Sequence, residues 1–234
     1  PKEGALEGEI LALLITSLLE IGISSFRIDL GYKDLLKEIM IKLGIPEMEQ
    51  ELLQQMILTR NNEAITRTLE KRSLPDESIK SFIALVSCQS LSSIIELKAL
   101  KSLGLKRTWA ELQAITELLN YYDYTKFVFF DITLTKEIGY YTGLIFEVSV
   151  PEQGLFIGGG GRYDKLLQEF NRDDLGGVGF ALEIDKCLTT LLQQNPEILQ
   201  NKDLSVVIQA KNRLHGEPLA NLLRKMGIMA VIEA

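Results

Sequence analysis

Tyrosines, glycines and an arginine with the chemistry to bind a small polar molecule are concentrated in one part of this sequence. Residues 140–143 read Tyr-Tyr-Thr-Gly, and four consecutive glycines at 158–161 lead directly into Arg162 and Tyr163. Tyrosine offers a hydroxyl and a flat apolar ring, which suits a heteroaromatic ligand. Arginine offers a fixed fork of donors to a carboxylate or phosphate. These residue types predict a pocket for a small polar ligand.

The glycine run has two interpretations. Glycine loses the most backbone entropy on folding, so four in a row weaken a strand. Either the backbone comes close to a ligand or to another strand, or the run is a bulge or bend in a sheet. A phosphate-binding loop fits poorly, because no Gly-Lys-Ser/Thr follows and the spacing is not that of a dinucleotide fingerprint.

The side chains beside this run also leave alternatives open. Arg162 either binds a ligand or forms a structural bridge with Asp164 or Glu147. Adjacent side chains in a strand point to opposite faces, so we expect only one of Tyr140 and Tyr141 to line a pocket.

Groups for other kinds of chemistry are sparse. The single histidine, His215, has no neighbouring cysteine or second histidine, and we expect it at the surface. Cys88 and Cys187 lie far apart and match no metal-ligand spacing. We expect two buried free thiols, a cytoplasmic protein, and neither a metal nor a cofactor.

Composition agrees with an ordinary globular protein. The 234 residues are 46% hydrophobic and 24% charged, with a formal net charge of −7. This charge gives no sign of a generally basic nucleic-acid-binding surface. The apolar run 10–23 is interrupted by Thr16, Ser17 and Glu20 and is too short to span a membrane. Because the chain starts without methionine, we expect it to be part of a longer protein.

Hydrophobic periodicity predicts an α/β or α+β fold, and the strands joined by short turns favour an antiparallel sheet. Residues 45–123 carry only helical stripes and predict an insertion of three to five helices. Residues 203–234 have a βαβ pattern that indicates parallel strands. The predicted strands are 24–30, 127–130, 144–150, 155–157, 180–184, 204–210 and 229–232, and the predicted helices outside the insertion are 1–22, 32–43, 164–170, 185–194 and 216–226. Gly31 is expected to end the first strand.

Three motifs carry a family resemblance. They are YYTGLIFE at 140–147, GGGGRYDKLL at 158–167 and GVGFALEIDK at 177–186. Together they resemble the class II aminoacyl-tRNA synthetase core of histidyl-tRNA synthetase. They resemble still more the synthetase-like regulatory subunits of ATP phosphoribosyltransferase, a paralogous family that aminoacylates nothing. The match spans most of the chain.

The resemblance implies a fold and a set of domains. The fold is a class II synthetase-like antiparallel sheet flanked by helices. Residues 1–44 and 125–199 would be the two parts of this core, 45–124 the helical insertion, and 203–234 the start of a C-terminal α/β domain after a linker at 200–202. The residues that the resemblance assigns to histidine binding are Tyr140, Tyr141, Thr142, Gly159, Gly160, Arg162 and Tyr163.

Two departures separate the chain from the synthetase. The synthetase pattern has an arginine that activates the amino acid where this chain has Lys136, and an acid where it has Gly139. The third class II motif ends Gly-Leu-Glu-Arg, but this chain reads Glu-Ile-Asp-Lys from Glu183 to Lys186. A lysine is a point charge and cannot reproduce a bidentate grip on phosphate, and Glu183 would repel a triphosphate.

These departures predict a non-catalytic regulatory subunit that senses histidine. It would be required for the activity of a short-form ATP phosphoribosyltransferase catalytic subunit, in the first step of histidine biosynthesis, and take part in histidine feedback inhibition. The resemblance further implies a homodimer through the core, within a hetero-oligomer. The alternatives are a divergent histidyl-tRNA synthetase, which the net charge disfavours, and a stand-alone amino-acid-binding module, which gives the insertion no use.

Overall fold

The computed structural model describes residues 4–96, 99–134, 140–168, 175–196, 198 and 206–233. The chain divides into two compact units, Pro1–Leu191 and Leu192–Ala234, and each is described here by itself. The helical residues 45–124 lie within the first of them. The division into four domains stays a prediction.

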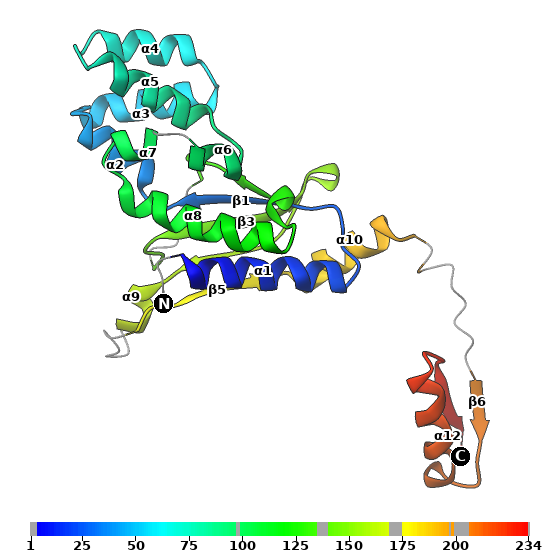
Figure 1. The fold of residues 1–234 in the computed structure, drawn as a ribbon. Helices are drawn as coiled ribbons and strands as arrows, with labels where there is room; N and C mark the ends of the chain where they lie inside the picture. Colours follow the sequence, from blue (N-terminus) through cyan, green and yellow to red (C-terminus); the bar gives the residue numbers. More distant parts are fainter. Residues whose placement is uncertain are drawn as a thin grey trace. The chain divides into compact units, whose positions relative to one another are not determined.

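A five-stranded sheet forms the centre of the first unit, in the order β2-β1-β3-β4-β5 (Figure 1). β1 and β2 are parallel, and the other neighbouring strands are antiparallel. With helices packed against it, this mostly antiparallel sheet confirms the predicted α+β class. The strands are β1 (Arg27–Tyr32), β2 (Val128–Phe130), β3 (Leu144–Val150), β4 (Leu155–Arg162) and β5 (Val178–Leu182).

One face of this sheet is the core of the unit. Alternate residues such as Ile28, Leu30 and Phe146 are fully buried there, as the period of two in a strand requires. α1 (Ala5–Glu20) and α8 (Lys106–Tyr121) lie side by side across the sheet (Figure 1). The apolar stripe of α1 enters the same core through Leu11, Leu14, Ile15 and Leu18.

The opposite face of the sheet carries the polar side chains of the strands together with glycines and a few apolar residues, and it is only partly buried. We call it the polar face and define it by the residues that share it in the strand register, namely Arg27, Asp29, Phe129, Ile145, Glu147, Ser149, Gly159, Gly161, Gly179 and Ala181. Most of them retain some exposure, whereas Ile145 and Gly161 are buried.

Short helices make up the segment between β1 and β2. They are α2 (Leu35–Lys42), α3 (Glu47–Leu58), α4 (Asn62–Glu70), α5 (Asp76–Ser87), α6 (Leu91–Glu96), α7 (Ala99–Ser102) and α8. Six of them are described between residues 45 and 123, so the prediction of three to five was wrong. α6 and α7 have six and four residues, which is too short for a 3.6-residue repeat to be recognised.

Two glycine predictions need correction. Gly31 does not end β1 but lies inside it, and a Cβ there would come 2.6 Å from the backbone oxygen of Asp131. β4 does not end at Ile157 but continues through all four glycines to Arg162. The pairing of β3 with β4 shifts register between Val148 and Ser149, so an irregularity precedes the glycines.

The remaining elements of the first unit are two helices and two short turns next to the strands. α9 (Asp164–Gln168) follows β4, and α10 (Ile184–Gln194), which ends in the second unit, follows β5. Short 3-10 turns cover Thr125–Phe127 and Pro151–Gln153. Cys187 on α10 is buried, but Cys88 is only half-buried, which corrects the expectation of two buried thiols. Burial raises the pKa of both thiols.

The second unit is a small βαβ element, as predicted. β6 (Val206–Gln209) and β7 (Ala230–Glu233) are parallel, with α12 (Arg213–Lys225) between them in sequence. Its own core contains Ile208, Ala220 and Ala230. The helix begins earlier than predicted, because the side chain of Asn212 accepts a hydrogen bond from the backbone N–H of His215. His215 is exposed, as expected. No helix in the described parts of either unit is long and apolar enough to cross a membrane.

Candidate functional site

Two tyrosine rings lie against glycines on the polar face. A Cβ on Gly161 would come 2.9 Å from ring carbons of Tyr141, and a Cβ on Gly179 would come 2.8 Å from the hydroxyl oxygen of Tyr163. Gly161 and Gly179 are register partners in β4 and β5, so their missing side chains would point to the same side. We call these two glycines the glycine shelf. Their absent side chains leave room for both rings.

The third tyrosine of the predicted set completes an aromatic cluster. The ring centroids of Tyr140 and Tyr141 are 4.8 Å apart, and those of Tyr140 and Tyr163 are 6.4 Å apart in an edge-to-face arrangement. Tyr141 is 8% exposed and lies on the shelf, whereas Tyr140 is 39% exposed. The cluster therefore presents one buried phenol and one exposed phenol beside Tyr163.

Burial raises the pKa of Tyr141 to about 12, with further contributions from Tyr140, including a hydrogen bond between their side chains, and from Tyr163. The charged phenolate is disfavoured in a site with little water. Tyr141 is therefore a neutral hydroxyl at physiological pH, able both to donate and to accept a hydrogen bond.

This shifted pKa predicts how stability changes in alkali. The folded-state pKa of Tyr141 lies above the ordinary 10.0, so its contribution to stability is complete below pH 10 and is lost as the pH rises through about 12. An ultraviolet titration of the folded chain should show one phenol ionising near pH 12, and Tyr141→Phe should remove it. If the phenol that Tyr141→Phe removes ionises near pH 10 in the unaltered chain, the burial of this hydroxyl is refuted.

A carboxylate lies on the polar face one row from the shelf. Asp29, Glu147 and Gly159 are register partners across β1, β3 and β4. Asp29 is ion-paired with Arg27 at 2.7 Å, and Glu147 is the carboxylate directly opposite Gly159 of the glycine strand. From the sequence, Glu147 was expected either to bridge to Arg162 or to be one of three acids, with Asp131 and Asp164, that could meet in space. Its place between Phe146 and Val148 in an alternating strand was the signal that it points to the face opposite those two core residues.

Gly160 belongs to the other face of the sheet. A Cβ there would meet the backbone oxygen of Gly179, and would come 2.7 Å from Cζ of the buried Phe146 and 2.8 Å from Cα of Phe180. The period of two in β4 separates it from Gly159. The structure therefore divides the predicted glycine pair between the core and the polar face.

Arg162 also points away from the polar face and forms a bridge. Its Nε donates to Asp164 Oδ2 at 2.8 Å, and its Nη1 donates to Glu7 Oε1 at 2.5 Å. Glu7 is buried on α1. Burial lowers the pKa of Arg162, but the hydrogen bonds and charges of these carboxylates outweigh it and leave the pKa raised. The bridge alternative is therefore realised, with Glu7 as the second partner rather than Glu147.

Hydrogen bonds attach this bridge to the segments that carry the tyrosines. The backbone N–H of Thr142 donates to the Arg162 carbonyl at 2.8 Å, and the Asp164 N–H donates to Thr142 Oγ1 at 3.1 Å. The Gly177 N–H donates to Asp164 Oδ1 at 3.0 Å, and the Tyr163 N–H donates to the Gly177 carbonyl at 2.7 Å. Thr142 and Arg162 thus hold the backbone beneath the aromatic cluster.

Comparison with known proteins identifies the family. Residues 3–187 match the sequence model of the family described as Histidyl-tRNA synthetase. The chain belongs to the histidyl-tRNA synthetase family. The fold and the motifs around the glycine shelf are those expected of a member.

Individual relatives of the family were also compared. Proteins named ATP phosphoribosyltransferase regulatory subunit are 28% identical in Caldanaerobacter subterraneus subsp. tengcongensis and 30% identical in Bacillus mycoides. Each alignment covers 94% of this chain, but 59% and 54% of the respective relative. The chain therefore spans little more than half the length of these relatives.

A solved structure is similar in fold. It is titled as an ATP phosphoribosyltransferase regulatory subunit/histidyl-tRNA synthetase from Bacillus halodurans C, and it superposes with a TM-score of 0.66 at 25% identity. The comparison covers 98% of this chain and 59% of that chain.

One of the two departures from the synthetase motifs, at Glu183 and Lys186, lies within the described residues. Lys186 and Glu183 form an ion pair of 2.7 Å beside the start of α10, and both side chains are substantially exposed. At the position of the arginine in the third class II motif, the charge of Lys186 is therefore neutralised by Glu183. The substitutions at Lys136 and Gly139 lie outside the described residues.

Proposed function

We propose that the chain forms part of a non-catalytic regulatory subunit of ATP phosphoribosyltransferase. The observation that supports this most is the name shared by relatives 28% and 30% identical to it over 94% of its length. In this proposal, the catalytic subunit binds ATP and phosphoribosyl pyrophosphate in the first step of histidine biosynthesis. The regulatory subunit is required for its activity and helps to transmit feedback inhibition by histidine.

The proposed ligand of the polar face is free histidine. The imidazole would pack against Tyr141 and Tyr163, whose hydroxyls are polar partners for the ring nitrogens. The ammonium would lie toward Glu147, in the row next to the shelf. The set of histidine-binding residues that the resemblance assigns stays a prediction, and it consists of Tyr140, Tyr141, Thr142, Gly159, Gly160, Arg162 and Tyr163.

The ion pair at the start of α10 gives a reason to propose sensing without activation. Lys186 is paired with Glu183, so the residue in place of the phosphate-gripping arginine faces a competing carboxylate. A lysine also lacks the planar fork that binds phosphate in a bidentate way. Coupling to the enzyme would be a difference in histidine affinity between two states of the complex.

The proposed partners follow from this role. A catalytic subunit of ATP phosphoribosyltransferase is the principal one, and a homodimer through the synthetase-like core would exist within the hetero-oligomer. tRNA is not a proposed partner, since the net charge is −7. A cytoplasmic location is part of the same proposal. The second candidate is a histidyl-tRNA synthetase, which the matching family description favours.

An activity assay distinguishes the two candidates. The full-length protein that contains this chain should stimulate a short-form ATP phosphoribosyltransferase catalytic subunit and make its activity sensitive to histidine. It should not catalyse histidine-dependent exchange of pyrophosphate into ATP. Exchange without stimulation of the catalytic subunit would reverse the assignment in favour of the synthetase.

The ligand proposal has a separate binding test. Calorimetric titration with L-histidine should give an affinity that Tyr163→Phe lowers by about tenfold, the usual cost of a lost hydrogen bond in a site without water. Tyr121→Phe is the matched control, because Tyr121 is 81% exposed and distant in sequence from the cluster. Equal histidine affinity in Tyr163→Phe and Tyr121→Phe would rule out this position for the ligand.

A further inference from the structure

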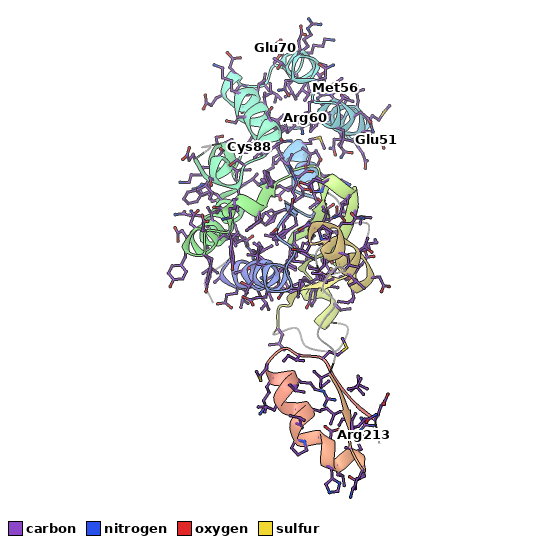
Figure 2. All side chains as sticks on the ribbon, turned by 90° about the vertical axis from the view of Figure 1, so that its right-hand side faces the viewer. Glu51, Met56, Arg60, Glu70, Cys88 and Arg213 are labelled. Atoms are coloured by element: carbon purple, nitrogen blue, oxygen red, sulfur yellow. The ribbon has the colours of Figure 1, made fainter. Side chains whose placement is uncertain are left out.

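A second hollow lies where the helical segment meets the sheet, and none of the tyrosines of the aromatic cluster lines it. Its volume is about 320 Å³, the lower end of the range for small-molecule sites. Figure 2 shows Arg60 and Cys88 on the side of the helical segment that faces the rest of the first unit. The polar and charged side chains that line the hollow are Arg27, Asp29, Arg60, Gln89, Asp131 and Thr133.

One charged pair of this hollow is already neutralised. Arg27 and Asp29 form an ion pair of 2.7 Å on the polar face. The Arg27 guanidinium also lies 4.0 Å from the centre of the Phe129 ring, which adds a cation–π contact. The charges of Arg27 and Asp29 therefore already satisfy each other, and we do not assign either side chain to ligand binding.

The other two charges of the hollow keep unused binding capacity. Asp131 Oδ1 accepts hydrogen bonds from the Thr133 N–H at 2.8 Å and from Thr133 Oγ1 at 2.6 Å. Within the described residues, neither the second oxygen of Asp131 nor the guanidinium of Arg60 has a hydrogen bond or ion pair. The carboxylate of Asp131 and the guanidinium of Arg60 can thus bind a ligand beside the neutralised Arg27–Asp29 pair.

The backbone holds Arg60 in an unusual conformation. Its φ of 54° lies in the left-handed region, which costs energy for a residue with a side chain. The turn is held at both sides, because the Arg60 N–H donates to the Ile57 carbonyl and the Asn62 N–H donates to the Arg60 carbonyl. Arg60 is thus held in this turn after α3, and it lines the hollow.

We propose that this hollow binds a free α-amino acid as a zwitterion. The ligand carboxylate would pair with Arg60 and its ammonium with Asp131, each through charge-assisted hydrogen bonds. A phosphate dianion would face Asp29 and Asp131, and a simple cation would face Arg27 and Arg60. A ligand of zero net charge, with its positive and negative groups apart, matches the charges that line the hollow. Because Arg60 follows α3 and Asp131 follows β2, the ligand would connect the helical segment to the sheet.

The experiment is calorimetric titration of the whole chain with the proteinogenic L-amino acids and with their carboxamide derivatives. It is carried out in the Tyr141→Phe/Tyr163→Phe background, so that histidine binding at the proposed polar-face site is weakened independently. At least one amino acid should bind. Arg60→Gln and Asp131→Asn should each weaken that binding by about tenfold or more, since each removes a charged partner of the ligand.

Two controls separate the hollow from general charge effects. Arg67→Gln removes an arginine that is 71% exposed and paired with Glu63 within its own helix, and it should leave the affinity unchanged. The carboxamide derivative should bind more weakly to the chain and be insensitive to Arg60→Gln. Absence of binding by every amino acid, or equal affinities in Arg60→Gln and Arg67→Gln proteins of native circular dichroism, overturns the proposal. Neither outcome affects the polar-face site, which is assayed with its tyrosines intact.

Discussion

Replacing Arg162 with methionine should lower the free energy of unfolding by about 3 kcal/mol, because it leaves a buried carboxylate without its partner. The Glu7 side chain is 5% exposed, and its ion pair with Arg162 joins α1 to the end of β4. Arg162 is 28% exposed, so the expected loss lies at the low end of the range for broken buried pairs. Urea unfolding followed by circular dichroism measures it.

The control for this prediction is Arg67→Met. That arginine pairs with Glu63 four residues earlier on α4, and both side chains are more than two-thirds exposed, so the unfolding midpoint should hardly move. The double variant Glu7→Leu/Arg162→Met should recover part of the lost stability, since it removes the isolated charge. If Arg162→Met unfolds at the same urea concentration as Arg67→Met, the bridge does not stabilise the fold.

The second large effect is expected for Gly160→Ala. The new methyl group would meet the Gly179 carbonyl oxygen and would come 2.7 Å from Phe146 and 2.8 Å from the Phe180 backbone. Strand β5 would have to move away from β4, which should cost about 3 kcal/mol or more, at the upper end of overpacking effects. Thermal and urea unfolding of the variant measure this loss, and failure to fold is its extreme form.

Gly143→Ala is the matched substitution for this test. The nearest atoms to a Cβ at Gly143 are Cδ and Cβ of the Arg162 side chain, at 3.4 and 3.7 Å, and its φ is not positive. We expect little change in stability there, because a flexible side chain can adjust by a few tenths of an ångström. Equal stabilities of Gly143→Ala and Gly160→Ala would contradict the tight pairing of β4 with β5.

Strands with side-chain alternation were predictable from the sequence, and the glycine strand was not. β3 occupies the predicted residues 144–150, because Phe146 and Val148 alternate with Glu147 and Ser149. The glycine half of β4 carries no side chains, so no pattern marks its continuation. What keeps it in the sheet is the pairing with β3 and β5 on both sides, which local sequence does not reveal.

The residue types of the candidate site were easier to predict than their directions. The tyrosines and glycines do come together, as the spacing of the motifs indicated. The partner of Arg162 was missed, because Glu7 lies 155 residues away in the sequence on an amphipathic helix. From the sequence, an acidic residue on an amphipathic helix is predicted to face solvent, and only the packing of α1 against the sheet shows that Glu7 is buried. The face that each residue of β4 occupies likewise required the register with its neighbours.

The parallel pairing of β1 with β2 sets an order for folding. β3, β4 and β5 are consecutive neighbours whose connections are much shorter than the helical segment. The partners of β1, by contrast, follow the whole helical segment in the sequence. Contacts that close long loops are entropically costly and form slowly. We therefore expect the meander of the last three strands to nucleate the sheet, and the insertion of β1 to be the late, rate-limiting step, detectable as delayed amide-exchange protection at residues 27–32.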